Sequence, residues 1–462
     1  MILIGPQQGA GVSPEAFVKN SDGIWVYPAT FQRIHWADTI GTISPTDGLF
    51  TVGATAGGAT SITIDRNGQA LTGTLLKSMM LKIGNNYYMV TSTATSSNNQ
   101  ITVNVYPAVA TDGIPDNTPV TICDPRLEVH DFALGVNALV WQPGFRAYML
   151  INPANCGYSG YPVGFFVKEQ PASGVDGVDY ITVYFDGFYA GKYQASREDA
   201  TSSAAGTGSI ATSRQGVVPW TSITYDDAVL ACARASATAG KDAPFRLINN
   251  RQWVALAVYS MLLGPAVFGP NRYGPFGNNS NTADPCDVDD SAVVFTADPT
   301  QANRALTGTG TKTGWATGQN LTAHNGKISG VYDLNGNVWE WVSGLKTKVG
   351  GTGGNSDTKF WVNDKDTGIA IPAGLASGDR FLSLMTNAEL RAHGIPAATD
   401  GTGNSQYGSD GFWFTTSANT EYVAIRGGYW FYGVRAGVWA LDLCIFRSYS
   451  STYIGFRLAL SL

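Results

Sequence analysis

The sequence predicts a mainly β protein whose C-terminal part combines strands with helices. Only 14% of the 462 residues are charged, whereas glycine is abundant at 55 residues, which is typical of a chain rich in turns. Alternating apolar and polar residues, interrupted by Asn-Gly and Asn-Asn pairs, dominate residues 61–123. Two segments near the middle of the chain have helical periodicity and helix-start signals instead.

The composition limits the classes of function. The length exceeds that of a usual single domain, so we expect two to four domains. The net charge is −6 and no block of Lys or Arg occurs, so the sequence gives no sign of a nucleic-acid partner. The five cysteines lie far apart, without a CxxC pair: Cys123, Cys156, Cys232, Cys286 and Cys444. Neither a zinc ribbon nor a complete disulfide framework is expected.

No membrane insertion is expected either. The N-terminal segment lacks the basic and apolar regions of a signal peptide, so no signal peptide is expected. The scattered, odd-numbered cysteines favour synthesis in a reducing cytoplasm. The longest apolar run, residues 253–269, is short for a membrane span and is interrupted by Gly264 and Pro265. We therefore expect this run to form a buried helix.

The elements follow in order along the chain. Residues 40–125 read as a small β-rich module, which resembles modules of phage tail and virion proteins. Residues 126–175 read as further strands joined by Pro and Gly turns. Residues 222–236 predict a helix capped by Thr224 or Asp226, and a second helix is predicted to begin after Asn249. The apolar stripe expected on the first helix consists of Ala228, Val229, Cys232 and Ala235.

Six motifs in the remaining sequence resemble those of one family. They are GFYAGKYQAS, VPWTSITYDDAVLACAR, FRLINNRQWVALA, GVYDLNGNVWEWV, RGGYW and IGFRLAL. In this order they resemble the formylglycine-generating-enzyme, or sulfatase-modifying-factor, family over residues 176–462. The element GNVWEW, Gly336 to Trp341, is the most specific of them. The resemblance implies an α+β domain with a variant of the C-type lectin fold, placed after the N-terminal β-rich modules.

The chain more closely resembles the variable proteins of diversity-generating retroelements, which use this fold to display a mutated C-terminal patch. Residues 386–390, 411–428 and 436–443 add to this resemblance. The patch would lie within residues 426–457. The implied variable positions are Tyr429, Phe431, Tyr432, Arg435, Asp442, Cys444, Ile445, Arg447, Tyr449, Ser451 and Tyr453. All of these residue types can be reached from an Asn codon by changes at adenine alone.

Strand alternation supports a displayed face, because successive side chains of a strand point to opposite sides. On this basis Tyr449, Ser451 and Tyr453 would share one face. In the preceding strand, Asp442 and Cys444 flank Leu443 and would point to the opposite side from the Leu443 side chain. Tyr, Ser and Asp on one face match the composition of binding surfaces. Core residues are expected at Trp430, Trp439, Leu441, Leu443, Ile454 and Phe456, with Arg426 and Arg457 as structural hydrogen-bond donors to loops.

The family resemblance also implies a structural calcium site. Its ligands would be the side chains of Asp333 and Glu340 and the carbonyls of Gly336 and Val338. Oxygen ligands around a tight glycine turn suit a hard cation. The alternative is that Glu340 is buried and paired without a metal, and no other cofactor is expected.

Enzymatic activity is not expected. The oxidases of the family hold copper through two thiols soon after the RGG motif, since a soft metal needs thiolate ligands. The matching positions here are Tyr432 and Gly437, and Cys444 stands alone. The iron enzymes of the family use His and Tyr, and no histidine follows His393.

These observations predict a receptor-binding protein of the phage tail-fibre type. Residues 1–39 would attach it to other virion proteins, 40–125 and 126–175 would space it, and 176–462 would present the patch at 426–457 to a host-surface protein or glycan. A homo-oligomer such as a trimer would raise affinity through avidity. The expected location is the virion, after synthesis in the bacterial cytoplasm, with the bacterial cell surface as the alternative. A fixed-specificity lectin-like binder and a structural virion protein are the alternative functions.

Overall fold

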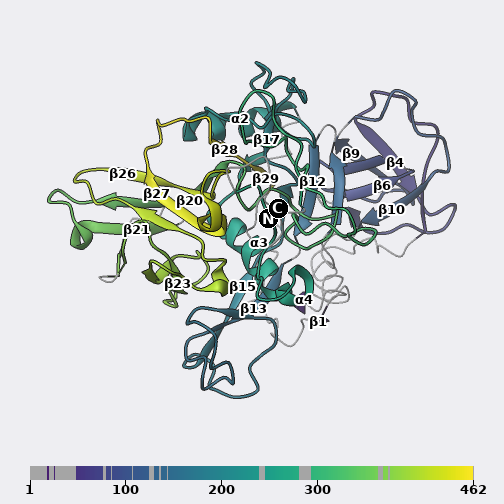
Figure 1. Cartoon of the computed structure of the whole chain (residues 1–462). Coiled ribbons are helices and arrows are strands. Elements are labelled where there is room, and N and C mark those ends of the chain that lie inside the picture. Colours follow the sequence, from purple (N-terminus) through teal and green to yellow (C-terminus); the bar gives the residue numbers. More distant parts are fainter. Residues whose placement is uncertain are drawn as a thin grey trace.

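The computed structural model of the chain is mainly β, with a few helices near the middle of the sequence (Figure 1). The predicted mainly β class with an α+β C-terminal part is therefore confirmed. The structure describes residues 18–19, 25–26, 48–75, 80–84, 86–106, 108–123, 130–134, 137–142, 144–238, 245–279, 293–362, 368–372 and 375–460.

The predicted small β-rich module is a closed barrel, drawn in purple and blue in Figure 1. In β9, Ile101, Val103 and Val105 face the interior and alternate with exposed residues, as the sequence pattern predicts. Asn67 and Gly68 both have positive φ, the conformation of a tight hairpin turn. The barrel strands, in spatial order, are β10 (Pro119–Cys123), β3 (Leu49–Thr51), β4 (Ser61–Asp65), β9 (Ile101–Tyr106), β7 (Asn86–Val90) and β6 (Met80–Ile83). A short ribbon of β5 (Thr74–Leu75) and β8 (Ala94–Thr95) accompanies it.

The predicted domain boundary at residue 176 is wrong, because strands from both sides of it pair with each other. β13 (Phe145–Leu150) pairs along its whole length with β15 (Tyr180–Phe185). This sheet also contains β14 (Phe166–Val167), β1 (Val18–Lys19) and β2 (Trp25–Val26). The predicted connecting region is thus part of the larger domain. Apart from β1 and β2, the predicted attachment segment lies outside the described residues.

A second sheet joins the same regions to the end of the chain. Its strands, in order, are β11 (His130–Leu134), β12 (Asn137–Gln142), β16 (Phe188–Gly191), β29 (Leu458–Leu460) and β19 (Phe245–Leu247). The last described strand therefore lies between strands from much earlier in the sequence. A separate ribbon is formed by β17 (Ala195–Arg197) and β18 (Ala211–Ser213).

The C-terminal sheet is the yellow and green layer of Figure 1. Its strands, in order, are β22 (Ile369–Ala370), β21 (Thr358–Val362), β20 (Trp339–Val349), β26 (Glu421–Gly427), β27 (Gly437–Ile445) and β25 (Phe412–Phe414). β28 (Ile454–Phe456) pairs with β20 in parallel. Beside the sheet lie the ribbon of β23 (Arg380–Leu384) and β24 (Pro396–Asp400) and the short 3-10 helices η2 (Asn355–Asp357), η3 (Ser405–Tyr407) and η4 (Gly433–Arg435).

The first predicted helix is α2 (Tyr225–Thr238), which begins after Thr224. The Thr224 hydroxyl accepts a hydrogen bond from the Asp227 amide at 3.2 Å, so Thr224 is the cap. The predicted apolar stripe is wrong at Val229, which is 39% exposed. The buried face follows the helical spacing of Ala228, Ala231, Cys232 and Ala235 instead.

The second predicted helix is α3 (Asn250–Leu263), and it begins after Asn249 as predicted. The Asn249 side chain accepts from the Gln252 amide, and the Gln252 side chain accepts from the Asn249 amide. The helix is buried on nearly all sides, which explains its continuous apolar sequence. It ends at Gly264, and the separate short helix α4 (Pro265–Phe268) follows. Within the described ranges, no helix is long and apolar enough to cross a membrane.

Two buried arginines tie the domain together, as the sequence predicts. Arg457 bonds to both carboxylate oxygens of Glu340, at 3.1 and 2.8 Å, and donates to the carbonyls of Gly191 and Tyr332. Both side chains of this ion pair are fully buried. Arg426 donates to the Asn250 side chain and to the carbonyls of Trp439, His393 and Gly394. Each guanidinium therefore joins one strand to several distant segments.

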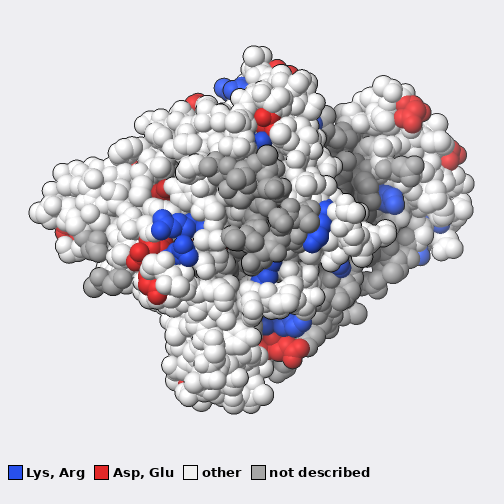
Figure 2. Space-filling view, in the orientation of Figure 1, with Lys and Arg blue, Asp and Glu red and all other residues white. Residues whose placement is uncertain are grey.

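Charged groups are sparse on the face of the molecule drawn in Figure 2. On the face drawn in Figure 2, Lys and Arg form small separate groups among mainly uncharged residues. Contacts made by this face therefore depend mostly on neutral polar and apolar groups.

Replacing Arg457 should be far more damaging than replacing a surface cation. In Arg457→Met, Glu340 stays buried without its counter-charge, which should lower the free energy of unfolding by about 3–5 kcal/mol. Lys348→Met is the matched control, since it removes a surface pair with Glu421 (3.3 Å) and should cost less than about 1 kcal/mol. Chemical denaturation measures both. Equal small losses would show that the Arg457 pair does not hold the fold.

Candidate functional site

The candidate site consists of two loops in the predicted patch segment, residues 426–457. The chain leaves the C-terminal sheet after β26 and runs through residues 428–436, which include η4, before it returns as β27. It leaves again through residues 446–453 before β28. Tyr429 of the first loop stacks on Tyr453 of the second, with ring centroids 4.8 Å apart. The two loops therefore form one surface.

Aromatic side chains dominate this surface, which we call the aromatic patch (Tyr429, Phe431, Tyr432, Tyr449 and Tyr453). Tyr429 lies at its centre, with ring centroids 4.7 Å from Tyr432 and 6.3 Å from Phe431. The hydroxyls of Tyr449 and Tyr453 are 3.0 Å apart. Phe431 is 58% exposed and Tyr449 is 40% exposed, so the patch presents rings to solvent. Five of the predicted variable residues are thus brought together.

Two tryptophans support the patch. The Trp413 ring lies 4.8 Å from Tyr432, and the buried Trp339 ring lies 5.5 Å from it. The sequence analysis missed this role. Trp413 reaches the site because β25 pairs in parallel with β27, a long-range contact that no local pattern indicates. The sequence contains one hint only: Trp413 lies in segment 411–428, which adds to the resemblance to variable proteins.

The strand β27 has the predicted alternation. Leu441 and Leu443 point into the core, and Asp442 and Cys444 lie on the opposite side. The prediction that Asp442 is displayed is wrong, because its side chain is buried near Tyr432. The Asp442 carboxylate accepts a hydrogen bond from the Cys444 amide at 2.7 Å, and burial raises its pKa to about 6. Burial also raises the pKa of the Cys444 thiol well above its ordinary value, so this thiol is neutral at pH 7.

The other predicted variable residues lie around the aromatic patch. Arg435 is exposed on η4, and Ile445 packs partly against the core beneath the tyrosines. Arg447 forms an exposed ion pair with Asp226 at the start of α2, and its guanidinium lies 4.8 Å from the Tyr225 ring centroid. The interactions of Arg447 are therefore directed toward the helix rather than toward the tyrosine cluster.

The prediction of a strand over residues 448–453 is wrong, because this segment is a loop. Its backbone carbonyls bind donors from several different elements rather than from one neighbouring strand. These bonds are Tyr225 N to Arg447 O (3.0 Å), Ser222 N to Ser451 O (2.9 Å), Arg304 Nη1 to Thr452 O (2.9 Å) and Trp339 N to Tyr453 O (2.9 Å). The conformation of the loop is thus fixed largely through its backbone carbonyls.

Arg304 holds this loop from within the protein. Its guanidinium is buried and pairs with Asp298 at 2.6 Å, while its Nη1 also donates to the Thr221 hydroxyl at 2.7 Å. The sequence analysis missed Arg304, because it lies in a long polar stretch with no regular period. Two partners, the buried Asp298 and the partly buried Thr221, therefore orient the group that holds the Thr452 carbonyl.

The first loop is anchored in the same way. The Gly433 amide donates to the Asn279 carbonyl at 2.7 Å, and the Trp430 amide donates to the Asn337 carbonyl at 3.3 Å. The Arg435 carbonyl accepts from the Gly411 amide at 2.9 Å. Side chains on both loops can therefore change while these backbone bonds persist.

The residues of the predicted calcium site do not fit a calcium ion in this arrangement. Asp333 accepts from the Gly308 amide at 2.7 Å, and the Val338 carbonyl accepts from the Gln194 side chain at 3.1 Å. Both oxygens of Glu340 already bind Arg457, whose positive charge would repel a cation. Within the described residues, no group of three His, Cys, Asp or Glu side chains could hold a metal. The structure matches the alternative expectation that Glu340 is buried and paired. Gly336, the remaining predicted ligand, has a positive φ angle.

Comparisons with known proteins give remote similarities only. No protein-family model matches the chain, and no curated protein matches it either. Similar solved structures include PvdO from Pseudomonas aeruginosa, which is 17% identical with a TM-score of 0.32, covering 71% of this chain and 95% of that one. Two variants of the major tropism determinant, P3c and I1, are 12% and 13% identical, with TM-scores of 0.28 and 0.26. Each similarity covers 84% of this chain, together with 85% of the P3c chain and 86% of the I1 chain.

These likenesses are too low to carry an argument about function. The formylglycine-generating-enzyme type of the C-terminal domain stays a prediction from the sequence motifs.

Asp442 should make the stability of the site depend on pH. Its pKa is about 6 in the folded protein and 3.8 ordinarily, so its contribution to stability is present below about pH 4 and is lost as the pH rises through about 6. Asp442→Asn keeps an acceptor for the Cys444 amide and removes the charge. We expect this variant to exceed the wild type in unfolding free energy by roughly 2–3 kcal/mol at about pH 8 and to match it near pH 4. Urea denaturation at both pH values tests this, and a less stable variant at pH 8 would contradict it.

Proposed function

We propose that the chain is a non-enzymatic receptor-binding protein of a phage, which attaches to the host-cell surface through the aromatic patch and its neighbouring loop residues. The single observation that carries this proposal is that exposed rings stand on loops whose backbones are held by scaffold donors. The resemblance of the sequence to variable proteins of diversity-generating retroelements supports the same proposal. Its location would be the virion tail, with other virion proteins as partners of the N-terminal part.

The chemistry of the aromatic patch suits protein or glycan recognition. Tyrosine gives a large contact area with few rotatable bonds, and its hydroxyl both donates and accepts hydrogen bonds. Trp413 and Trp339 support Tyr432 from beneath, so the ring is already ordered before binding. Less conformational entropy is then lost on binding, which favours affinity. A homo-oligomer such as a trimer would add avidity.

The anchoring of the loops suits a surface whose side chains are exchanged. The bonds that shape residues 446–453 use the carbonyls of variable and invariant positions alike. A new side chain at Tyr449 or Ser451 therefore leaves the loop in place. The neighbouring Trp430, Trp439, Ile454 and Phe456 are buried and would stay constant.

The chemistry of the cysteine supports the absence of oxidase activity. The positions of the copper-binding thiols of the family are Tyr432 and Gly437. Cys444 is nearby, but the raised pKa of its thiol disfavours the thiolate that a soft metal needs. We therefore infer that the fold serves here for binding and not for oxidation.

Sequencing the 3′ end of the gene and its flanks across a population tests the proposal. We expect substitutions at Phe431, Tyr449 and the other variable positions, constancy at Trp430 and Trp439, and a nearby near-copy that is rich in Asn codons. The physical reason is that Phe431 and Tyr449 are exposed, whereas Trp430 and Trp439 are buried in the core. A uniform 3′ end without such a copy would contradict the proposal that the patch is diversified. It would favour a fixed-specificity lectin-like binder or a structural virion protein.

Truncating two rings of the patch should separate binding from folding. In Tyr449→Ala with Tyr453→Ala, retention of the purified protein on intact host cells should fall by about tenfold or more, because aromatic anchors dominate interfaces. The melting temperature should fall by less than about 4 °C, since Tyr449 is exposed and Tyr453 half-buried.

Trp439→Ala serves as the control, because it empties a fully buried site and should cost about 3–5 kcal/mol. If the double tyrosine variant unfolded as readily as this control, the two tyrosines would be core residues and not contact residues.

A further inference from the structure

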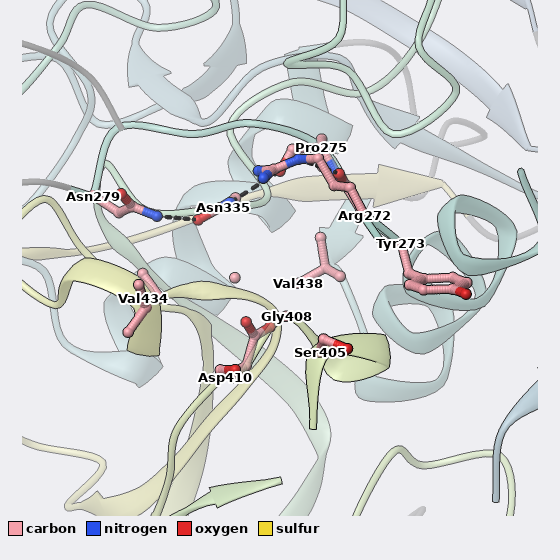
Figure 3. Close-up of a pocket in the computed structure, with 14 residues that line it drawn as sticks. Arg272, Tyr273, Pro275, Asn279, Asn335, Ser405, Gly408, Asp410, Val434 and Val438 are labelled. Atoms are coloured by element: carbon pink, nitrogen blue, oxygen red, sulfur yellow. Dashed lines mark hydrogen bonds between the residues drawn. The ribbon is translucent and has the colours of Figure 1, made fainter. Parts of the chain in front are cut away.

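A cavity of about 340 Å³ is lined in part by the loop of residues 428–436, which also carries three residues of the aromatic patch (Figure 3). Val434 of η4 lines the cavity, and Tyr432, which precedes the same short helix, belongs to the patch. The same loop therefore contributes residues to the patch and to the lining of the cavity. The polar side chains of the lining come from Arg272, Tyr273, Asn279, Asn335, Ser405, Ser409 and Asp410.

One wall of the cavity carries two buried amides in fixed positions. The Asn279 side chain donates to the Asn335 side-chain oxygen at 3.1 Å, and Asn335 donates to the Pro275 carbonyl at 2.9 Å. The close approach of the two segments requires glycine at position 277, where a Cβ would lie 1.7 Å from the Asn335 carbonyl oxygen. The amides are thus oriented before any ligand enters.

The opposite wall carries a buried carboxyl. Asp410 is 2% exposed, accepts a hydrogen bond from the Trp439 amide at 2.7 Å, and lies with Ser405 across the cavity from Asn335 (Figure 3). A Cβ at Gly437 would lie 2.2 Å from the Asp410 Oδ1 atom, so glycine leaves the carboxyl its place. Burial raises the pKa of Asp410 well above its ordinary value, which favours a neutral carboxyl that can donate as well as accept.

The remaining walls combine a fixed cation with apolar surface. Arg272 donates to the carbonyls of Gly274 and Pro275 at 3.1 and 3.3 Å, and its guanidinium lies 3.8 Å from the Phe276 ring centroid. Val434, Val438 and the Tyr273 ring supply the apolar part of the lining. The cavity therefore offers donors and acceptors beside apolar surfaces.

We propose that this cavity binds a neutral, hydroxyl-rich ring of monosaccharide size. Sugar hydroxyls both donate and accept, as do the Asn279 and Asn335 amides and the Ser405 hydroxyl, and the faces of a sugar ring are apolar. The volume lies at the lower end of the range for ligand pockets, roughly 300–1,000 Å³, which suits one ring rather than an oligosaccharide. None of these lining residues is a predicted variable position. The cavity is thus a constant site beside a changeable one, and it stands independently of the function proposed for the patch.

Binding of simple glycosides to the full-length protein tests this proposal. The probes are the methyl glycosides of glucose, galactose, mannose, N-acetylglucosamine and rhamnose, each followed by saturation-transfer NMR up to about 10 mM, because a single sugar ring binds weakly. We expect at least one glycoside to bind. Its affinity should fall by about tenfold or more in Ser405→Trp and in Val434→Trp, which place a large ring at the exposed edge of the cavity.

Two controls make the outcome decisive. Tyr449→Ala with Tyr453→Ala changes the patch and not the cavity, so glycoside binding should persist even where retention on host cells is lost. Sodium sulfate and glycine are the charged probes, and competition by either of them would overturn the neutral-ligand class. The proposal also fails if no glycoside binds the wild type, or if the bound glycoside is unaffected by both tryptophan variants.

Discussion

The buried ion pair between Arg457 and Glu340 is the interaction on which the rest of the domain depends. Its guanidinium reaches carbonyls 266 and 125 positions earlier in the chain, at Gly191 and Tyr332, and Gln194 completes the hydrogen bonds of Glu340. Neither charge contacts water, so the pair is favourable only when every partner is in place. This condition fixes β28 against β20 and thereby positions the loops on either side.

The site divides structural and contact roles between backbone and side chains. Scaffold donors hold the carbonyls of residues 446–453, among them Arg304, and leave the side chains of the loop to face outward. Asp442 of β27 turns inward instead, and burial raises the pKa of its carboxyl. The loop anchoring thus explains the exposed rings, whereas the burial of Asp442 follows from its place on β27.

Features set by neighbours in the chain could be predicted from the sequence, and features set by distant contacts could not. The start of α3 after Asn249 depends on a cap and a side chain three residues later, and the alternation of β27 depends on a period of two. The loop at 446–453 has the same alternating pattern, but its carbonyls are bound by separate distant donors. Trp413 and Arg304 reach the site through long-range pairing that leaves no local signal.

The closed barrel of residues 49–123 has a consequence for crowding. An open sheet exposes unpaired amides and carbonyls along its outer strands, and these recruit strands from neighbouring molecules. Closure of β10 onto both β3 and β6 removes such edges from the barrel. The barrels of neighbouring molecules therefore cannot merge edge to edge.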